Sequence, residues 1–574
     1  MNASLRKWYR STFGYAAVSA VLLWAALPPL QLWPLAWIAP LWWVLLIRRK
    51  ELGGRRPYTA LWTVGLLSWL AVLHWLRLPH PATSIGWVAL SFYFAFYLPV
   101  FVGLSRVAVH RLRVPVILVA PIVWAGLELA RAHLLTGMTM ASLGHTQYRW
   151  IGLIQIADLA GPYAVGFVVM FTAACLARMV PCGANRRAIW PLAPAAAVLT
   201  ATLLYGYLRT SGDYTSPGAR IALIQGSIDT QMKTDPQMRT RIHEHYRNLS
   251  RQAIEQYGKP DLIIWPETMF RDTLLTCRPN ALMREVYKQQ HWTQRQFQQA
   301  LEETARQSRC GMGRMATELG AAMIIGVDNT DFGPEGARFY NAAACVQADG
   351  RLAGVYRKHH LVMFGEYVPF GKYIPQLQRL TPVPVSLDAG DRPVAFKLNT
   401  LSIAPNICYE SVLSHVIRRQ VNTLAAENAE PDILVNLTND GWFWGSSELD
   451  LHLICGVFRA VECRKPFLIA ANTGFSAWID GDGRIVRQGP RRATGTILAQ
   501  VCTDRRTSCY LRGGDWPAAL CLAACLLLAI AGLWQKWVMG KRPFSGAATR
   551  PVSAVPQAGS DAAPLNSPIQ GSSE

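Results

Sequence analysis

Eight apolar segments limit what this chain can fold into more than any other feature of the sequence. Seven follow one another within the first 210 residues, and the eighth lies near the C-terminus. A helix needs about 20 mostly apolar residues to cross a hydrocarbon core. The segments cover residues 13–30, 32–47, 59–76, 84–105, 114–130, 162–177, 189–208 and 516–535, although Pro34 and Pro40 interrupt the second one. We therefore predict a polytopic α-helical membrane region of about eight spans, with about seven in residues 1–210 and a final one in 514–537.

Lysine and arginine residues are concentrated in alternate connections between these segments. Eighteen fall on one side, whereas the short connections of the other side hold only Arg77, Arg131, Arg149, Arg209 and Arg220. Basic connections tend to stay in the cytoplasm. The asymmetry therefore predicts that both termini are cytoplasmic. The long segment between residues 208 and 516 is then exported to the opposite face, which is periplasmic or extracellular.

The net charge of +21 raises the question of nucleic-acid binding. Residues 221–512 hold 34 basic and 29 acidic side chains, a net charge of only +5, and the remainder of the chain carries +16. No basic stripe with interleaved aromatic residues occurs in the exported segment. Most of the positive charge therefore lies outside the exported segment, where it determines membrane topology, and we expect no nucleic-acid partner.

Short β-type runs alternate with helical stretches between residues 218 and 510. The predicted strands cover residues 220–225, 261–266, 322–327, 340–347, 352–358, 402–407, 433–437, 467–471 and 475–480, and the predicted helices cover residues 236–257, 283–319, 409–421 and 447–463. Runs such as 262–264 and 433–435 are continuously apolar, which is typical of strands buried on both faces. The pattern predicts an α/β domain over residues 218–510. The tail over 543–574 is rich in Ala, Pro, Ser and Gly, and we expect it to be a disordered cytoplasmic segment. Cysteine spacing suggests possible disulfides between Cys277 and Cys310 or between Cys502 and Cys509, without deciding the connectivity.

Three reactive side chains occupy the ends of predicted strands. Glu267 follows the strand 261–266, Lys358 ends the strand 352–358, and Cys408 directly follows the strand 402–407. Each alone has an ordinary structural explanation, since a lone cysteine is usually a small buried hydrophobe. Together they suit acyl transfer, because a carboxylate can take the thiol proton, the thiolate can attack a carbonyl, and an ammonium can stabilise the oxyanion. Strand ends are also where α/β sheets gather their functional groups.

The sequence around these positions resembles the nitrilase superfamily. The matching blocks are Trp265-Pro266-Glu267, Lys358-His359-His360-Leu361 with Phe364-Gly365-Glu366, and Asn406-Ile407-Cys408-Tyr409-Glu410. Asn439-Asp440-Gly441-Trp442-Phe443 and Ala471-Asn472-Thr473-Gly474-Phe475-Ser476 extend the match. A domain of this kind flanked by seven spans and one span is similar to the membrane-embedded branch of the superfamily, the apolipoprotein N-acyltransferases. The resemblance implies an αββα sandwich, a bacterial inner membrane location and a catalytic domain on the periplasmic side.

The resemblance also implies a reaction and its participants. Cys408 would take an acyl chain from a phospholipid, typically phosphatidylethanolamine, and form a thioester. The α-amine of an apolipoprotein's diacylglyceryl-cysteine would then accept the chain. Glu267 is carried over as the general base and Lys358 as the oxyanion stabiliser. Supporting or substrate-binding roles fall to five further residues: Glu366, Tyr409, Glu410, Trp442 and Phe443. Neither a cofactor nor a metal ion is expected.

Two other functions remain open from the sequence. The same Cys-Glu-Lys group with water as the acceptor would make a membrane-tethered amidase or nitrilase. A transporter or scaffold whose exported domain only binds ligands is the third possibility. Few ionisable residues lie in the spans, chiefly His74 and Glu128, which is weak support for a transport path.

Overall fold

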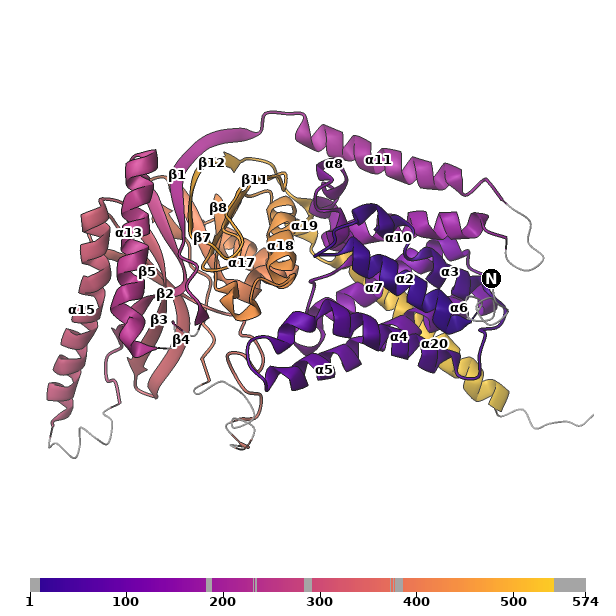
Figure 1. Cartoon of the computed structure of the whole chain (residues 1–574), viewed down its shortest axis with the longest axis horizontal. Coiled ribbons are helices and arrows are strands. Elements are labelled where there is room, and N and C mark those ends of the chain that lie inside the picture. The colour runs from indigo at the N-terminus through magenta and orange to yellow at the C-terminus, as the bar shows by residue number, and fades with distance from the viewer. Residues whose placement is uncertain are drawn as a thin grey trace, which may run out of the picture.

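Helices form both ends of the described part of the chain, with a long α/β segment between them. The computed structural model describes residues 11–181, 188–230, 232, 235–282, 292–371, 373–374, 376 and 386–540. The tail predicted to be disordered, 543–574, lies outside the described residues, as do residues 1–10. Figure 1 shows the two bodies side by side, with the helical region on the right and the sheets on the left.

Every predicted apolar segment coincides with helix. The main helices are α2 (Thr12–Ala26), α3 (Leu41–Arg48), α4 (Pro57–Val72), α5 (Thr83–Phe94), α6 (Tyr97–Arg106), α7 (Val116–His133), α10 (Pro162–Met179), α11 (Leu192–Thr210) and α20 (Trp516–Gly540). Five stretches are long and apolar enough to cross a membrane: Thr83–Arg111, Val116–Thr136, Pro162–Met179, Leu192–Thr210 and Trp516–Trp534. Thr12–Ala26, Trp33–Arg48 and Pro57–Val72 are shorter apolar stretches, so the count of eight spans stays a prediction.

Helix α7 packs closely against α20, which comes from the other end of the chain (Figure 1). Gly126 allows this approach, because a Cβ atom there would lie 2.7 Å from the backbone of Cys521. Small residues at such crossings let two backbones come together where lipid offers no hydrophobic drive for association.

Two six-stranded sheets make up the α/β segment. The first has the order β12-β1-β2-β3-β4-β5, and the second β11-β10-β9-β8-β7-β6. The strands of the first are β1 (Thr215–Gln225), β2 (Leu262–Cys277), β3 (Ala322–Gly333), β4 (Gly336–Val346), β5 (Leu352–Arg357) and β12 (Gly495–Asp504). Those of the second are β6 (Phe396–Leu398), β7 (Leu401–Ile407), β8 (Ile433–Thr438), β9 (Phe467–Ala471), β10 (Ala477–Ile479) and β11 (Ile485–Gln488). Strands β1, β2 and β3 run parallel, as do β7, β8 and β9.

The sheets face each other across an apolar core that includes Ile264, Ile324, Ile407 and Val435. Helices α13 (Arg239–Tyr257) and α15 (Gln294–Leu319) cover the outer face of the first sheet (Figure 1). Helices α17 (Ser414–Ala426) and α18 (Glu448–Cys463) cover the second. Because α18 also lies against the helical region, it is buried on nearly all sides, with only Asp450 partly exposed.

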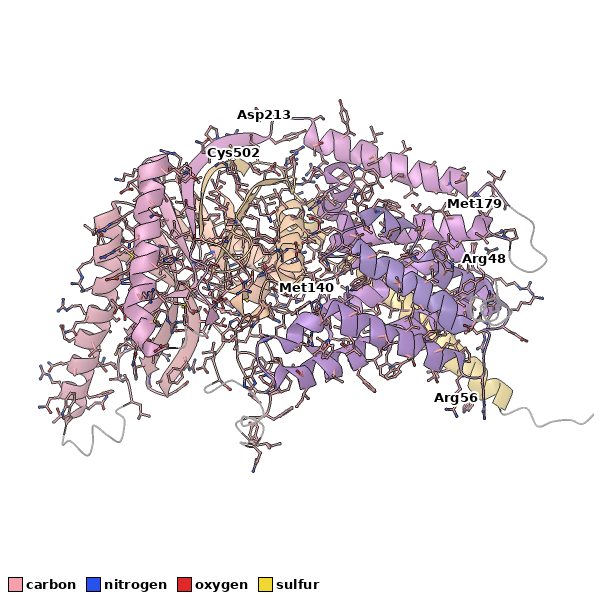
Figure 2. The ribbon with its side chains drawn as sticks, in the orientation of Figure 1. Arg48, Arg56, Met140, Met179, Asp213 and Cys502 are labelled. Carbon is pink, nitrogen blue, oxygen red and sulfur yellow. The ribbon has the colours of Figure 1, made fainter. Side chains whose placement is uncertain are left out.

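The two bodies are fastened by buried polar contacts as well as by apolar ones. Asp158, on α9 (Ala157–Ala160), accepts hydrogen bonds from Arg464 at 2.6 and 2.8 Å, and both side chains are almost fully buried. Arg209 and Tyr205 of α11 donate to the same carboxylate at 2.9 and 2.6 Å. In Figure 2, Met140 lies where the bodies meet, whereas Arg48, Arg56 and Met179 lie at the far end of the helical region.

Several local predictions need correction. Glu267 does not follow a strand, because β2 continues to Cys277 and contains it. The helix predicted over 409–421 is divided into the 3-10 turn η7 (Cys408–Val412) and α17, since the turn closes on the end of β7. Strands β6, β11 and β12 were not predicted, because they are short or carry alternating exposed side chains. Cys277, Cys310, Cys502 and Cys509 are free thiols and form neither suggested disulfide.

Candidate active site

Glu267 is placed by an irregularity in strand β2. Residues 262–265 pair with 322–325 of β3 in regular register, but the next pair joins Phe270 to Val327. The extra residues of β2 form a bulge, in which Thr268 adopts a positive φ of 52°. Gly326 of β3 makes room for the bulge, because a Cβ atom there would lie 2.6 Å from the Cα atom of Glu267.

Two asparagines hold the Glu267 carboxylate inside the domain. Oε1 accepts from the side-chain amide of Asn341 at 2.6 Å, and Oε2 accepts from the backbone N–H of Asn439 at 2.9 Å. Glu267 is only 8% exposed. Hydrogen bonds to both oxygens fix the direction in which this carboxylate presents its remaining lone pairs.

Lys358 follows directly after β5 and is 1% exposed. Its Nζ atom lies 2.9 Å from Oε1 of Glu366, whose other oxygen accepts from the backbone N–H of Val362 at 2.8 Å. Burial alone lowers the pKa of Lys358, but the charges of Glu366, Cys408 and Glu267 outweigh burial and raise it above its ordinary value. The lysine is therefore a fixed ammonium ion, and Glu366, whose side chain is 14% exposed, is its ion-pair partner.

Cys408 begins the turn η7 at the end of β7 and has a φ of +51°. A non-glycine residue in this region is strained, and such strain persists where the surrounding structure imposes it. Burial raises the pKa of the Cys408 thiol well above its ordinary value; the charge of Glu267 raises it further, and Lys358 opposes this. The thiol is therefore protonated at neutral pH and needs a base before it can attack.

The backbone carbonyl of Cys408 is held from three directions. The side-chain amide of Asn436 and the hydroxyl of Ser411 each donate to it at 3.0 Å, and Nε2 of His452 lies 3.2 Å away. Nδ1 of His452 lies 3.0 Å from Oδ1 of Asp440. Burial lowers the pKa of His452, but Asp440 and the carbonyl raise it more, which favours an imidazolium that donates to both oxygens.

Asp440 and His452 also lie close to Glu448. Side-chain oxygen and nitrogen atoms of the three residues lie within 4.8 Å of one another, a spacing that can accommodate a metal ion. Asp440 already accepts from the hydroxyl of Thr438 at 2.7 Å, and His452 contacts the Cys408 carbonyl. We therefore treat Asp440 and His452 as a hydrogen-bonded support for Cys408, and a metal-free site stays a prediction.

The carboxylate of Glu410 links two backbone segments by hydrogen bonds, one beside Lys358 and the other beside Cys408. Oε1 accepts from the N–H groups of His359 and His360 at 2.8 and 3.0 Å, and Oε2 accepts from that of Ile407 at 2.7 Å. The hydroxyl of Tyr356 also donates to this carboxylate. Glu410 is fully buried and acts on the chain beside Lys358 and Cys408 rather than on the ammonium itself.

The side chains beside Cys408 connect it to the helical region. Tyr409 donates its hydroxyl to the carbonyl of Gly137 at 2.7 Å. Phe443 packs edge-on against Trp75, with ring centroids 5.1 Å apart, whereas Trp442 is 39% exposed. An apolar cluster joins both bodies here: Leu27, Leu73, Trp75, Phe94, Met138, Met140, Ala141, Val412, Leu413, Leu451 and Cys455. Apolar surface therefore runs from the helices to the edge of the site.

The structure thus brings Glu267, Lys358, Cys408 and Glu366 into one electrostatically coupled group, with Tyr409, Glu410 and Phe443 around it. The sequence alone did not single out the supporting residues Asn341, Asn436, Asp440, Ser411 and His452. Asp440 lies in one of the sequence blocks that resemble the nitrilase superfamily, and that position could have indicated a role at the site. Asn341 and Asn436 are isolated polar residues in apolar strands, where a buried amide needs a partner.

Two family models match the chain. The N-terminal domain of apolipoprotein N-acyltransferase matches residues 19–175, and the carbon-nitrogen hydrolase domain matches residues 220–509. A curated apolipoprotein N-acyltransferase from Rhodopirellula baltica is 33% identical over 573 residues, covering 92% of this chain and 98% of that protein. One from Geobacter metallireducens is 31% identical and covers 92% of this chain and 96% of that protein. A solved variant of the amidase from Nesterenkonia sp. AN1 is 16% identical, with a TM-score of 0.34, covering 56% of this chain and 100% of that one.

Proposed function

This chain belongs to the apolipoprotein N-acyltransferase family, and from that premise we propose how its residues carry out the reaction. It is an acyltransferase that N-acylates lipoproteins, and its α/β segment has the nitrilase-like fold predicted from the motifs. The hydrolase and transporter alternatives are not favoured, because acyltransferases match the chain over both its helical and its α/β parts.

In the first half-reaction, Glu267 accepts the thiol proton as Cys408 attacks an ester carbonyl of a phospholipid, with phosphatidylethanolamine as the expected donor. The Lys358 ammonium stabilises the tetrahedral oxyanion. Collapse of this intermediate breaks the ester C–O bond, and the proton held by Glu267 passes to the leaving oxygen. A lysophospholipid departs, and the acyl chain remains on Cys408 as a thioester.

In the second half-reaction, the α-amine of a diacylglyceryl-cysteine attacks the thioester. Glu267 accepts a proton from the attacking nitrogen, the C–S bond breaks, and the proton returns to the sulfur of Cys408. The product is an amide. One observation carries this proposal: the charges of Glu267 and Lys358 both act on the thiol of Cys408, while Asn341 and Glu366 hold them in place.

The apolar cluster between the bodies supports a membrane-adjacent site. Both proposed substrates carry acyl chains, so a nucleophile next to apolar helices spares those chains exposure to water. Phe443, with its contact to Trp75, is the proposed acyl-lining side chain. Trp442, which is exposed, is proposed to face the entering lipid.

We propose a bacterial inner membrane location with the catalytic domain periplasmic and both termini cytoplasmic. Arg48 and Arg56, from a basic connection, lie at the end of the helical region away from the sheets (Figure 2), as the positive-inside rule requires. Reporter fusions after residue 540 and within the loop 334–335 test this. A periplasmic reporter signal from the C-terminal fusion would reverse the proposed orientation.

Incubation of the full-length protein with phosphatidylethanolamine and a diacylglyceryl-cysteine peptide tests the reaction. We expect an N-acylated peptide, and, without the peptide, an acyl-sized mass on Cys408 that hydroxylamine removes. Cys408→Ala should abolish both, while Cys310→Ala, which changes an exposed thiol, should retain both. Phospholipid hydrolysis without peptide acylation would contradict the proposal.

A further inference from the structure

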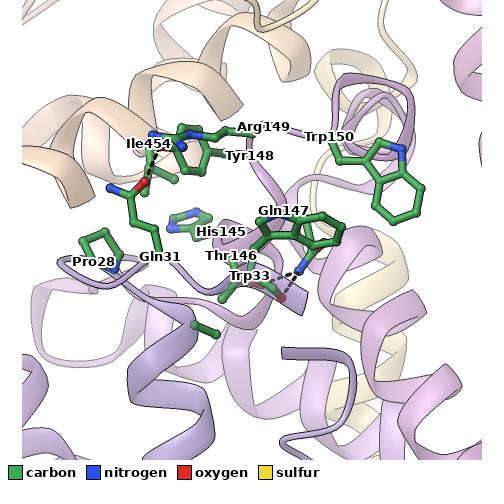
Figure 3. Close-up of a pocket in the computed structure, with 11 residues that line it drawn as sticks. Pro28, Gln31, Trp33, His145, Thr146, Gln147, Tyr148, Arg149, Trp150 and Ile454 are labelled. Atoms are coloured by element: carbon green, nitrogen blue, oxygen red, sulfur yellow. Dashed lines mark hydrogen bonds between the residues drawn. The ribbon is translucent and has the colours of Figure 1, made fainter. Parts of the chain in front are cut away.

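A cavity lies between the helical region and the α/β segment, on another side of α18 from Cys408. It has a volume of about 290 Å³, near the lower end of the range for ligand pockets. Figure 3 shows the polar residues that point into it: Gln31, His145, Gln147, Tyr148 and Arg149. Ile454 of α18 lines the cavity, whereas Leu451 and Cys455 of that helix join the cluster beside Cys408. The cavity and the site at Cys408 therefore both contact α18, but through different residues of this helix.

His145 provides an independent sign that the cavity holds a ligand. Its ring is fully buried, yet neither ring nitrogen has a hydrogen-bond partner among the described residues. Burial, together with the charges of Arg459 and Arg131, lowers the pKa of His145 well below its ordinary value. The neutral imidazole therefore offers one donor and one acceptor, and leaving both unsatisfied in a buried place is costly.

The charges around His145 favour a bound anion. Arg131 and Arg459 are paired with Glu128 and Glu462. Arg149, which is exposed at the rim, forms no ion pair within the described part of the chain. Its Nε atom donates to the hydroxyl of Tyr148 at 2.8 Å, and that hydroxyl donates to Gln31 at 3.1 Å (Figure 3). A guanidinium fixed in this way keeps its terminal N–H groups for a phosphate or carboxylate.

The carboxylate of Asp450, which contacts Gln31, does not cancel this charge. Asp450 accepts from Gln31 at 3.4 Å, but it is neutralised by Arg491, whose Nη2 atom lies 2.6 Å away. Arg149 therefore remains the uncompensated charge at the mouth of the cavity.

The surrounding aromatic rings place the cavity at the level of lipid headgroups. Trp33 and Trp150 line it, with ring centroids 5.7 Å apart, and Trp33 is 40% exposed. Trp and Tyr are enriched where a membrane protein passes from hydrocarbon to water. The cavity lies at such a passage, because apolar helices adjoin it on one side and the α/β segment on the other (Figure 1).

We propose that this cavity binds the phosphate-bearing headgroup of a bilayer lipid, at a site separate from the acyl-donor site at Cys408. The phosphate lies against Arg149 and the donor nitrogen of His145, and the remainder of the headgroup lies between Gln31 and the tryptophan rings. A lipid held there is not consumed by the reaction.

Thermal unfolding of the full-length protein, in a detergent without phosphate, tests the proposal. Glycerophosphoethanolamine should raise the unfolding midpoint with a saturable concentration dependence, whereas ethanolamine at equal ionic strength should not. Arg149→Gln should weaken the response about tenfold or more, because a charge-assisted hydrogen bond is lost. His145→Phe should remove the response. If the His145 variant does not fold, the Arg149→Gln variant still tests the binding site, because Arg149 is exposed and its substitution does not disturb the core.

Arg77→Gln is the matched control, because Arg77 is also exposed, lies on the same predicted face and stacks over Trp87 at 5.9 Å. It should keep the full response. An equal response to inorganic phosphate would overturn the lipid assignment in favour of a free-anion site. A response that survives in both cavity variants would overturn the site itself. N-acylation by Arg149→Gln should show an unchanged KM for the phospholipid, and a raised KM would place the cavity in the donor path instead.

Discussion

Asn341 donates a side-chain N–H to Oε1 of Glu267 at 2.6 Å, and the same nitrogen lies 3.2 Å from Oε1 of Glu366. One amide therefore links the proposed base to the carboxylate that holds Lys358. Losing a hydrogen bond to a charged group costs about 1.5–3 kcal/mol. Asn341→Ala should slow thioester formation about ten- to hundredfold, measured by the appearance of acylated protein in intact mass spectrometry. Asn422→Ala, on the exposed side of α17, should react at the normal rate. An unaffected Asn341→Ala would remove Asn341 from the site.

The raised pKa of Cys408 predicts slow alkylation. A thiol whose pKa lies above its ordinary value has few thiolate ions at pH 7, so the rate with iodoacetamide should keep rising as the pH passes 9. Glu267→Gln removes a negative charge that raises this pKa, so it should speed alkylation at a fixed pH while abolishing acyl transfer. The rate is followed on the peptide that contains Cys408. A rate that is already independent of pH near 7 would indicate a preformed thiolate and contradict this account.

Gly326 should be intolerant of any side chain. A Cβ atom there would lie 2.2 Å from the carbonyl oxygen of Pro266, so Gly326→Ala must displace the bulge that carries Glu267. We expect acyl transfer to fall by at least tenfold, since misplacement of a catalytic group by about 1 Å has effects of that size or larger. Gly311→Ala is the control, because its Cβ atom would make an ordinary 3.5 Å contact with Phe270. Equal activity of the two variants would show that the bulge does not position Glu267.

His452 should act by positioning Cys408 and not by binding lipid. His452→Leu removes the donor that faces the Cys408 carbonyl, so kcat should fall while the KM for phospholipid stays unchanged. His452→Gln retains an N–H donor and should recover part of the rate. A change in KM with kcat preserved, or no rescue by glutamine, would point to a different role. His80→Leu, at an exposed position, controls for the loss of a histidine.

Asp158→Asn should loosen the attachment between the two bodies. The change leaves Arg464 buried with less negative charge, and breaking one side of a buried ion pair costs about 3–5 kcal/mol. The unfolding midpoint should therefore drop clearly, whereas Asp213→Asn, at an exposed carboxylate, should leave it within experimental error. Retention of the normal midpoint by Asp158→Asn would mean that the Asp158–Arg464 ion pair does not contribute to holding the bodies together.

The helices and strands could be predicted from the sequence because each one produces a recognisable local run of apolar residues. Apolar segments of membrane length and short apolar strands follow from local composition, and the eight helical segments and nine of the twelve strands were located in this way. Glu267, Lys358 and Cys408 were found because each lies in a recognisable block of residues. Their roles remain proposals, as do the span count and the orientation.

The supporting contacts depend on tertiary distance and could not be read from local pattern. Asn341 and Glu267 are 74 residues apart, and His452 and Cys408 are 44 apart. The bulge in β2 escaped notice because Trp265-Pro266-Glu267 has the proline of a strand end, yet pairing with β3 resumes beyond it at Phe270. Gly326, which makes that continuation possible, lies on a different strand.

The buried joint between Asp158 and Arg464, with the bond from Tyr409 to Gly137, has a consequence for how substrates travel. Cys408, the proposed nucleophile, lies in a segment that contacts the helices at several points, so it cannot move away from them into the bilayer. The lipid donor and the lipoprotein must each diffuse in the plane of the membrane to a stationary cysteine. Lateral diffusion of the substrates, and not motion of the enzyme, then brings each of the two to the site in its turn.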